Sequence, residues 1–245
     1  ALSGLILQNE HTFEEKIIVQ AAHKLNIPVI TVCHGYIQQS ELVCIAPFTA
    51  NYMVLWSQSQ KEFLDNYDSE FEDRSLFLGW PFPRLSKTNL LPDRVLIILT
   101  DVDNDLREDE YLLTIRFLDE YIHREENCTI RLHPASMKSN SERVNFIMDR
   151  YECYLNTDPL EASLESAGLV LGHDSSVLVT SAMNNIPTFR FEETAKAFMP
   201  EVMTSKMEHI LETKLEDLVV KTQDQIADKP DLSEIAKSIF NRLIN

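Results

Sequence analysis

Short apolar runs alternate with amphipathic segments along most of the chain, and this alternation predicts an α/β fold. The first half holds four apolar runs that predict strands, at residues 4–8, 28–33, 52–56 and 75–78. Helices are predicted between them: one after Thr12, which can form a capping box with Glu15, and one after Ser57. A strand, a helix and a second strand in succession form a βαβ unit, so we expect the strands to run parallel.

The second half repeats this alternation with a larger number of predicted strands. Strands are predicted at residues 94–100, 128–132, 152–155, 167–172 and 186–191. The segments between them have a helical period, and the chain from Glu192 onward reads as further helices. We therefore expect two Rossmann-like, doubly wound parallel-sheet domains of the α/β class, of which the first is incomplete.

Apolar stripes along the helical segments indicate which faces are buried. In the first half, the stripes consist of Ile17, Ile18, Ala21, Ala22 and Leu25, and then of Phe63, Leu64 and Tyr67. In the second half, they consist of Leu112, Ile115, Leu118 and Ile122, and finally of Leu232, Ile235, Ile239 and Leu243. Each stripe predicts a helix that packs one face against a sheet or a neighbouring helix.

A glycine and two prolines between Gly79 and Arg84 mark a break in the pattern. This break predicts a partial first domain at residues 1–84, a linker at 85–93, a second domain at 94–195 and C-terminal helices at 196–245. The sequence opens on Ala1 and passes almost at once into the first strand. We therefore expect an upstream segment or a partner to complete the first domain.

Composition narrows the classes of function. The formal net charge of −17 at pH 7 argues against nucleic-acid binding and against electrostatic docking on an anionic membrane. No apolar run approaches the roughly 20 residues of a membrane span, and the start lacks the pattern of a signal peptide. The four cysteines show no CxxC spacing, and three of them lie in apolar runs, so we expect core residues rather than metal ligands or disulfides, which fits a reducing cytoplasm.

The clearest candidate for chemistry is the polar turn between the predicted strand at 167–172 and the helix that follows it. Asp174 or Ser175 can cap this helix, and Ser176 comes next. The first N–H groups of a helix are unpaired and its dipole is positive there, so the turn favours an anion, typically a phosphate. A capped helix without any ligand has the same sequence, and both readings stay open.

Two histidines follow strands at the edge where ligands bind in open α/β sheets. His34 and Gly35 end the second strand of the first half, and His133 and Pro134 end a strand of the second half. Arg131 and Lys138 give His133 a locally positive setting in an acidic chain. An imidazole suits acid–base chemistry and can donate to phosphate oxygens, although each histidine can also be an ordinary turn residue.

Metal sites have weaker support. Asp101, Asp103 and Asp105 are spaced as in a calcium loop, but the glycine and the closing glutamate of such a loop are absent. We expect these acids to cap the next helix instead. A zinc site of His34, His133 and His173 lacks a close histidine pair or a supporting cysteine. We therefore predict no metal and no cofactor.

Three motifs in order resemble one branch of the GT-B glycosyltransferases: His34-Gly35, His133-Pro134 and Asp174-Ser175-Ser176. That branch holds the CDP-glycerol glycerophosphotransferases, capsule polysaccharide transferases, and the bacterial sialyl and Kdo transferases that use CMP-sugars. The turn at Gly79-Trp80-Pro81 is similar to the Gly-x-Pro that ends the first domain in many of them. The resemblance extends to about residue 195.

The resemblance implies a metal-independent transfer from a CMP- or CDP-activated donor to a cell-surface glycan, as in capsule or lipopolysaccharide synthesis. It implies His34 as the general base for the acceptor and His133 as a second catalytic residue at the donor phosphate. The implied donor-binding residues are Arg131, His133, Pro134, Asp174, Ser175 and Ser176, with Gly35, Gly172, His173 and Glu192 as additional candidates. The expected location is the cytoplasm, either free or peripheral at the inner membrane.

Two alternatives remain. A UDP-GlcNAc 2-epimerase-like enzyme has the same architecture, but it is expected to show Ser-Gly-Gly where this chain has Ser175-Ser176. A non-catalytic domain with this fold can serve as a binding or assembly module, and the short first half favours that. The chain also departs from the sialyltransferases, because it holds no acidic pair followed by glycine at the expected base region.

Overall fold

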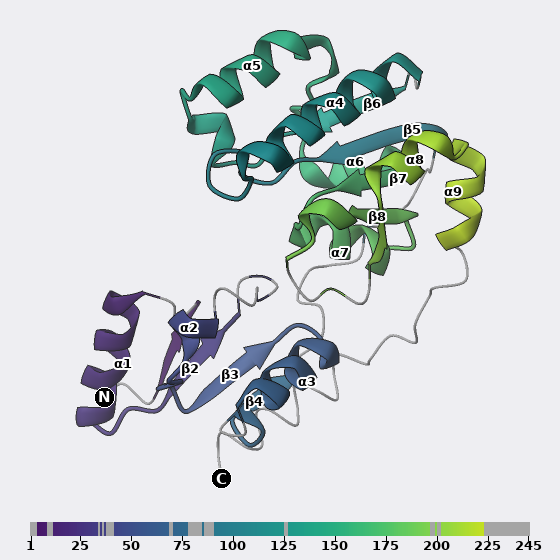
Figure 1. Ribbon diagram of the computed structural model, residues 1–245. Helices are drawn as coiled ribbons and strands as arrows, with labels where there is room; N and C mark the ends of the chain where they lie inside the picture. The colour runs from purple at the N-terminus through teal and green to yellow at the C-terminus, as the bar shows by residue number, and fades with distance from the viewer. Residues whose placement is uncertain are drawn as a thin grey trace. The chain divides into compact units, whose positions relative to one another are not determined.

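The computed structural model describes residues 4–8, 12–33, 35, 37, 42–68, 71–77, 85, 91–124, 127–196, 199 and 202–222. The chain divides into two compact units, one built mainly from residues 1–82 and the other from residues 83–195 and 201–227. Each unit contains a parallel sheet with helices, as the alternation in the sequence predicted (Figure 1). The α/β fold class is therefore confirmed.

The first unit has a four-stranded parallel sheet in the order β1-β2-β3-β4. Its elements are β1 (Leu5–Leu7), α1 (Phe13–Lys24), β2 (Val29–Val32), α2 (Leu42–Ile45), β3 (Tyr52–Leu55), α3 (Gln58–Tyr67) and β4 (Ser75–Phe77). Thr12 forms the predicted capping box with Glu15. The strands follow one another across the sheet in a single direction, as in one half of a doubly wound sheet.

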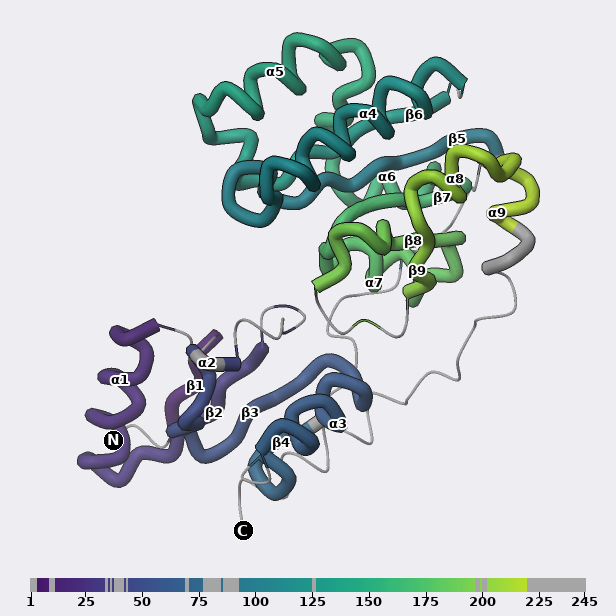
Figure 2. The backbone as a smooth tube through the Cα atoms, in the orientation of Figure 1, coloured from purple at the N-terminus to yellow at the C-terminus, as the bar shows by residue number. Residues whose placement is uncertain are grey.

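The second unit has a five-stranded parallel sheet in the order β6-β5-β7-β8-β9 (Figure 2). The strands are β5 (Leu91–Ile98), β6 (Cys128–Arg131), β7 (Ala167–Gly172), β8 (Thr188–Phe191) and β9 (Met203–Ser205). The helices are α4 (Glu108–Arg124), α5 (Glu142–Arg150), α6 (Leu160–Ser166), α7 (Ser176–Met183), α8 (Met207–Glu212) and α9 (Leu215–Thr222). The chain moves from β5 to one side and then returns to the other, so this sheet has the reversal of a doubly wound fold.

Three boundaries differ from the sequence prediction. β5 begins at Leu91, inside the predicted linker, and its pairing with β7 shifts register between Leu91 and Val95. The predicted strand at 152–155 is instead a short 3₁₀ helix, η4 (Glu152–Tyr154), with a single bridge between Ile130 and Leu155. β9 is an edge strand in a segment that was predicted to be helical. Tertiary pairing decides such short elements, because three residues carry too little periodicity.

In several helices, the buried residues differ from the predicted apolar stripes. α1 buries Val19 and Ala22, while Ile17, Ile18 and Leu25 are exposed. The buried residues of α4 include Phe117 and Tyr121 as well as the predicted Leu118 and Ile122, whereas Leu112 is exposed; likewise Tyr67 of α3 is exposed. The predicted stripe at 232–243 lies outside the described residues.

β7 is the centre of the second unit. All six of its residues are buried, and so are all four of β8. Helix residues such as Phe117, Leu118 and Ile147 share one core with β5, β6 and β7. At the end of β7, Gly172 lies beside Ile98 of β5, and a Cβ on Gly172 would fall 2.3 Å from the Ile98 carbonyl oxygen. Gly172 is therefore required by the close approach of two strands.

Replacing this glycine tests that packing. Gly172→Ala forces β5 and β7 apart, and overpacking of this kind costs about 1–3 kcal/mol of unfolding free energy. Gly35→Ala is the matched control, because a Cβ there meets no atom within 4 Å and its expected change is within about 0.5 kcal/mol. Denaturant unfolding of both variants measures the difference. Equal stabilities would contradict a steric role for Gly172.

Candidate functional site

The candidate site lies at the carboxyl edge of the second sheet, where the strand order reverses. The chain leaves β5 towards β6 on one side and returns to β7 on the other, so the reversal falls between β5 and β7. Ligands of open α/β sheets bind beyond the strand ends at such a point. Three loops meet this edge: residues 99–105 after β5, 132–139 after β6, and 173–175 after β7.

The turn after β7 delivers the N-terminus of α7 to this edge. Ser175 is the N-cap in extended conformation, and its Oγ accepts a hydrogen bond from the Val177 N–H at 3.2 Å. The Leu178 N–H donates to the Ser175 carbonyl at 3.0 Å. None of the contacts found within the described residues uses the Ser176 N–H. The helix is therefore capped, as one of the two readings expected.

Asp174 forms an ion pair with an arginine that sequence analysis did not single out. Asp174 Oδ1 lies 3.1 Å from Arg190 Nη1, and both side chains are largely buried. Arg190 Nη2 also donates to Thr204 Oγ1 at 3.3 Å, so the arginine joins the ends of β7, β8 and β9. This pair accounts for Asp174 without a ligand, while its predicted contact with a donor phosphate stays a prediction. The sequence feature that could have indicated this ion pair is Arg190 itself, a charged residue within the buried strand β8.

His133 is exposed at the end of β6, as its position before Pro134 predicted. The Ala135 N–H donates to His133 Nδ1 at 3.2 Å, so Nδ1 acts as an acceptor. In the neutral ring the proton then lies on Nε2, which can act as a donor. The geometry therefore gives His133 a hydrogen-bond donor of the kind a phosphate oxygen accepts.

Asp101, at the end of β5, holds the loop that carries His133. Asp101 Oδ1 accepts from Ser136 Oγ at 3.3 Å and from the Asp103 N–H at 3.2 Å, and Oδ2 accepts from Asn104 Nδ2 at 2.8 Å. Burial raises the pKa of Asp101, but these hydrogen bonds outweigh the effect of burial and hold the pKa below its ordinary value. The site thus has a fixed negative charge beside His133.

Among the described contacts, Asp101 and Asp103 bond within their own loop and to the loop after β6 rather than to the start of α4, which differs from the prediction. Asp103 accepts from Ser139 Oγ at 2.7 Å, and Asp105 accepts from the Asp101 N–H. Instead, Glu110 accepts from the Arg107 N–H at 2.8 Å at the start of α4. Within the part of the chain that the structure describes, no group of side chains is arranged to hold a metal ion.

Arg131 and His173 have structural partners. Arg131 Nη1 donates to Asn156 Oδ1 at 3.0 Å and to the Asp158 carbonyl at 2.7 Å, which fastens β6 to the loop before α6. His173 is fully buried: its Nδ1 lies 2.8 Å from Thr194 Oγ1 and its Nε2 lies 3.3 Å from Thr114 Oγ1. His173 is therefore a core residue that joins α4 to β7, and its candidacy as a donor-site residue stays a prediction.

The remaining candidates are placed more simply. Pro134 and Glu192 are exposed, at the ends of β6 and β8. His34 lies outside the described residues.

The next residue along the chain, Gly35, has a partner in a buried glutamine. Its carbonyl accepts from Gln60 Nε2 at 2.8 Å, and Gln60 Oε1 accepts from the Trp56 N–H at 3.0 Å. This buried glutamine joins the loops that follow β2 and β3, a role that no local pattern in the sequence indicated.

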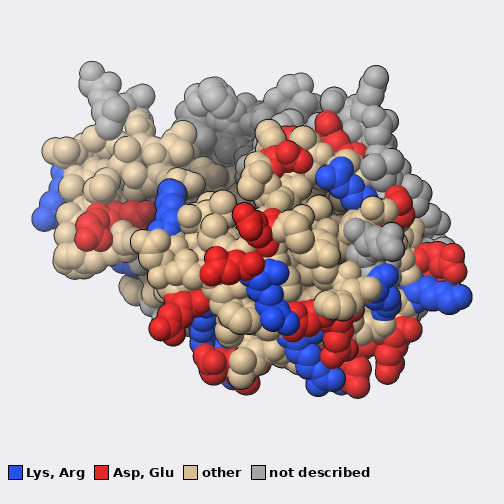
Figure 3. All heavy atoms as spheres, turned by 90° about the horizontal axis from the view of Figure 1, so that it is seen from above, with Lys and Arg blue, Asp and Glu red and all other residues tan. Residues whose placement is uncertain are grey.

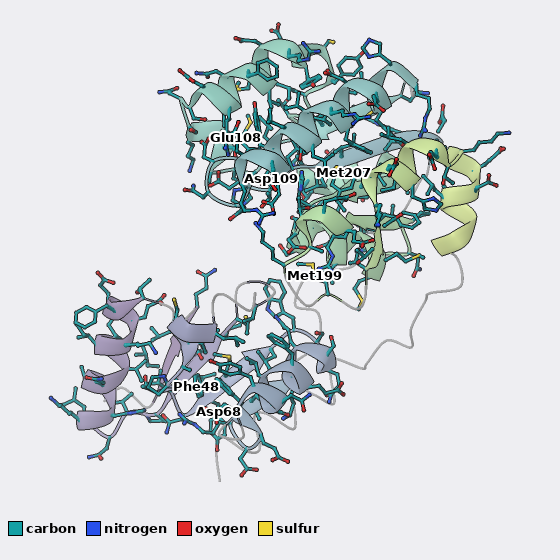
Figure 4. The ribbon with its side chains drawn as sticks, in the orientation of Figure 1. Phe48, Asp68, Glu108, Asp109, Met199 and Met207 are labelled. Atoms are coloured by element: carbon teal, nitrogen blue, oxygen red, sulfur yellow. The ribbon has the colours of Figure 1, made fainter. Side chains whose placement is uncertain are left out.

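The face of the protein seen in Figure 3 is mixed in charge, because acidic side chains are interspersed with lysines and arginines there. Glu108 and Asp109 lie at the start of α4, where Glu108 pairs with Arg143 and Asp109 with Arg107 (Figure 4). None of the described helices is long and apolar enough to cross a membrane.

Comparison with known structures finds the same fold. TarM from S. aureus, in complex with fondaparinux, alpha-GlcNAc-glycerol and UDP, matches with a TM-score of 0.63 and 13% identity over 98% of this chain. A putative UDP-N-acetylglucosamine 2-epimerase from Listeria monocytogenes matches with 0.64 and 14% over 96%. The wall teichoic acid polymerase TagF matches with 0.53 and 13% over 98%.

These likenesses confirm two Rossmann-like units. This chain covers 55% of the TarM chain, 72% of the epimerase chain and 74% of the TagF chain. No protein-family model matches the sequence, and no curated protein matches it. TagF represents the teichoic-acid branch of the resemblance, while the sialyl and Kdo branches stay a prediction.

The role of Asp101 can be tested through pH. Asp101→Asn removes a charge and one acceptor from a buried network, so we expect a loss of about 1–2 kcal/mol of unfolding free energy at pH 7. Because the folded-state pKa is lowered, the contribution is present above the ordinary carboxyl pKa of about 4 and is lost as the pH falls through the folded value. Denaturant unfolding at pH 7 and pH 3 measures both quantities.

Asp109→Asn is the control for this experiment. Asp109 is an exposed acid whose ion pair with Arg107 is also exposed, and such pairs contribute about 0–1 kcal/mol. A loss at Asp101 no larger than at Asp109, or one that is the same at both pH values, would contradict the network.

Proposed function

We propose that the protein is a metal-independent GT-B-type glycosyltransferase that takes a CMP- or CDP-activated donor. It transfers a sialic-acid-like or Kdo-like sugar, or an alditol phosphate, to a cell-surface glycan. The observation that carries this proposal is the presence, at one edge of one sheet, of the α7 N-terminus and the Nε2 donor of His133. The proposed location is the cytoplasm, free or peripheral at the inner membrane.

The spacing of the two groups supports an anionic ligand between them. β6 and β7 flank β5, so their ends are two strand spacings apart, about 10 Å. A phosphate in that gap accepts a hydrogen bond from His133 on one side and from the Ser175 hydroxyl or the Ser176 N–H on the other. An imidazole, a hydroxyl and a backbone amide can hold a phosphate by hydrogen bonds, so this arrangement does not require a metal ion.

The chemistry follows from where charge develops. When the bond between the donor phosphate and the transferred group breaks, the nucleotide takes the electron pair, and donors that already point at its oxygens stabilise that charge. The acceptor hydroxyl must lose a proton to a base near neutral pKa, for which His34 is the candidate. His133 supplies charge stabilisation rather than the base.

Two other functions have a specific observation each. A UDP-GlcNAc 2-epimerase-like enzyme is favoured by the likeness to the Listeria epimerase, whose TM-score of 0.64 exceeds the 0.53 of TagF. A non-catalytic binding module is favoured by the one-directional sheet of the first unit. Nucleotide binding separates both enzymes from the module, and the base of the nucleotide separates the two enzymes.

Calorimetric titration with CMP, CDP and UDP tests the proposal. We expect CMP or CDP to bind and to raise the stability by about 2.7 kcal/mol at a concentration of 100 Kd. His133→Ala removes a hydrogen bond to a charged group, worth about 1.5–3 kcal/mol, and should weaken binding roughly 10- to 100-fold. His123→Ala is the matched control, because His123 is an exposed histidine in the last turn of α4, at the opposite end of that helix from the carboxyl end of β5.

The outcomes separate the three functions. Binding of CMP or CDP that His133→Ala weakens and His123→Ala does not supports the transferase. Binding of UDP without binding of CMP or CDP supports the epimerase-like enzyme instead of the transferase. If no nucleotide binds, the proposal is wrong and the turn after β7 is a capped helix without a ligand.

A further inference from the structure

An arginine near the start of α5 fastens the loop that follows β5. Arg143 Nη1 donates to the carbonyl of Val102 at 3.0 Å and to the carbonyl of Leu106 at 2.8 Å. Both carbonyls belong to the loop between β5 and α4. A guanidinium that bonds both of them fixes the shape of this loop, and the charge on the donor makes each bond stronger than one between neutral groups.

The guanidinium of Arg143 is itself held by α4. It lies over the ring of Tyr111, with 4.9 Å between the guanidinium carbon and the ring centroid, and it forms an ion pair with Glu108. The Tyr111 hydroxyl donates to the Arg143 carbonyl at 3.3 Å. The Arg143 side chain is only 25% exposed. Stacking and ion pairing therefore keep the guanidinium in the place from which it reaches the loop.

The fastened loop in turn holds the segment that follows β6. Ser139 Oγ donates to Asp103 Oδ2 at 2.7 Å. Ser136 is fully buried, and its Oγ donates to Asp101 at 3.3 Å and accepts from the Val102 N–H at 3.4 Å. The contact at Ser139 is the shortest of the three, so we expect it to be the strongest. Together these bonds join the loops after β5 and β6 into one body.

The orientation of the His133 ring depends on this segment. The Ala135 N–H donates to His133 Nδ1 at 3.2 Å, and the Met137 N–H donates to the His133 carbonyl at 3.1 Å. Both donors belong to the turn that Ser136 and Ser139 hold against the loop after β5. If this turn moves, the Ala135 N–H separates from Nδ1 and the ring is released to rotate.

We infer that Arg143 is a positioning residue of the candidate site, which fixes the place and the tautomer of His133 without touching the donor. Its two bonds hold the loop after β5, that loop holds the turn after β6, and the turn keeps Nε2 of His133 as the hydrogen-bond donor. A ligand then meets a ring that is already oriented, which lowers the entropic cost of binding. The effect on nucleotide affinity rests on the proposed function, whereas the effect on His133 itself does not.

Arg143→Lys tests this role, with Arg150→Lys as the matched control. A lysine keeps the charge but lacks the planar fork that bonds both carbonyls. Arg150 lies on the same helix, makes a paired bond to Asp119 of α4 and stacks on Tyr151. Both changes remove a paired, stacked arginine from α5, so a general loss of stability is common to the two variants. An effect on His133 is expected only from Arg143→Lys.

Hydrogen exchange and nitrogen NMR of the ring report on His133 directly. In Arg143→Lys we expect the Ala135 amide to exchange about tenfold faster or more, because hydrogen bonds to a charged group are lost. In alkaline buffer, we also expect the ring nitrogen shifts of His133 to move towards those of His123, an exposed histidine that serves as an internal reference. Arg150→Lys should change the Ala135 rate less than about threefold. An Ala135 amide and a His133 ring that respond equally to the two variants would overturn the inference.

Nucleotide affinity shows whether the position of the ring matters for binding. We expect Arg143→Lys to weaken binding of CMP or CDP about tenfold, but less than about twofold when His133→Ala is already present, because Arg143 acts through that ring. Equal losses in the two backgrounds would also overturn the inference, since Arg143 would then act by another route. If the wild type binds neither nucleotide, the proposed function fails, while the Ala135 rate and the His133 shifts still decide the role of Arg143.

Discussion

The close approach of β5 and β7 at Gly172 is the constraint on which the second unit depends. Because no side chain separates the strands there, the His173 N–H reaches the Ile98 carbonyl at 3.1 Å. The His173 ring then falls between Thr114 and Thr194 and fixes α4 against the strand ends. The next residue, Asp174, meets Arg190, and the chain enters α7 from a turn with little freedom. A steric contact inside the sheet thus determines where the first amides of α7 lie.

Local rules in the sequence predicted much of this fold. The alternation of runs predicted the two parallel α/β units, and Thr12, Ser57 and Ser175 all cap the helices that they were predicted to start. Elements that depend on distant partners were missed: β9 exists because it pairs with β8. The outward stripe of α1 was misread because periodicity shows that a helix has an apolar face, but not which way that face points.

The candidate site, like the fold, could be predicted from the sequence only in part. His133 and Ser175 could be placed from sequence because both follow strands, and parallel strands end at one edge. The partnerships that hold the site could not, because Arg190 lies 16 residues from Asp174 and Ser136 lies 35 from Asp101. Contacts at such separations are set by the register of whole strands. The place of His34 stays a prediction.

The proposed recognition of a donor at this edge would rely on the His133 imidazole, amide dipoles and a hydroxyl rather than on a cluster of cations, in a chain of net charge −17. Dipoles act over a few ångströms, whereas the repulsion between the chain and an anion acts over roughly a Debye length, about 10 Å at 0.1 M salt. For the proposed anionic donor, added salt screens the repulsion and leaves the short contacts intact. Donor capture then speeds up with ionic strength, the reverse of enzymes that steer their substrates with a basic surface.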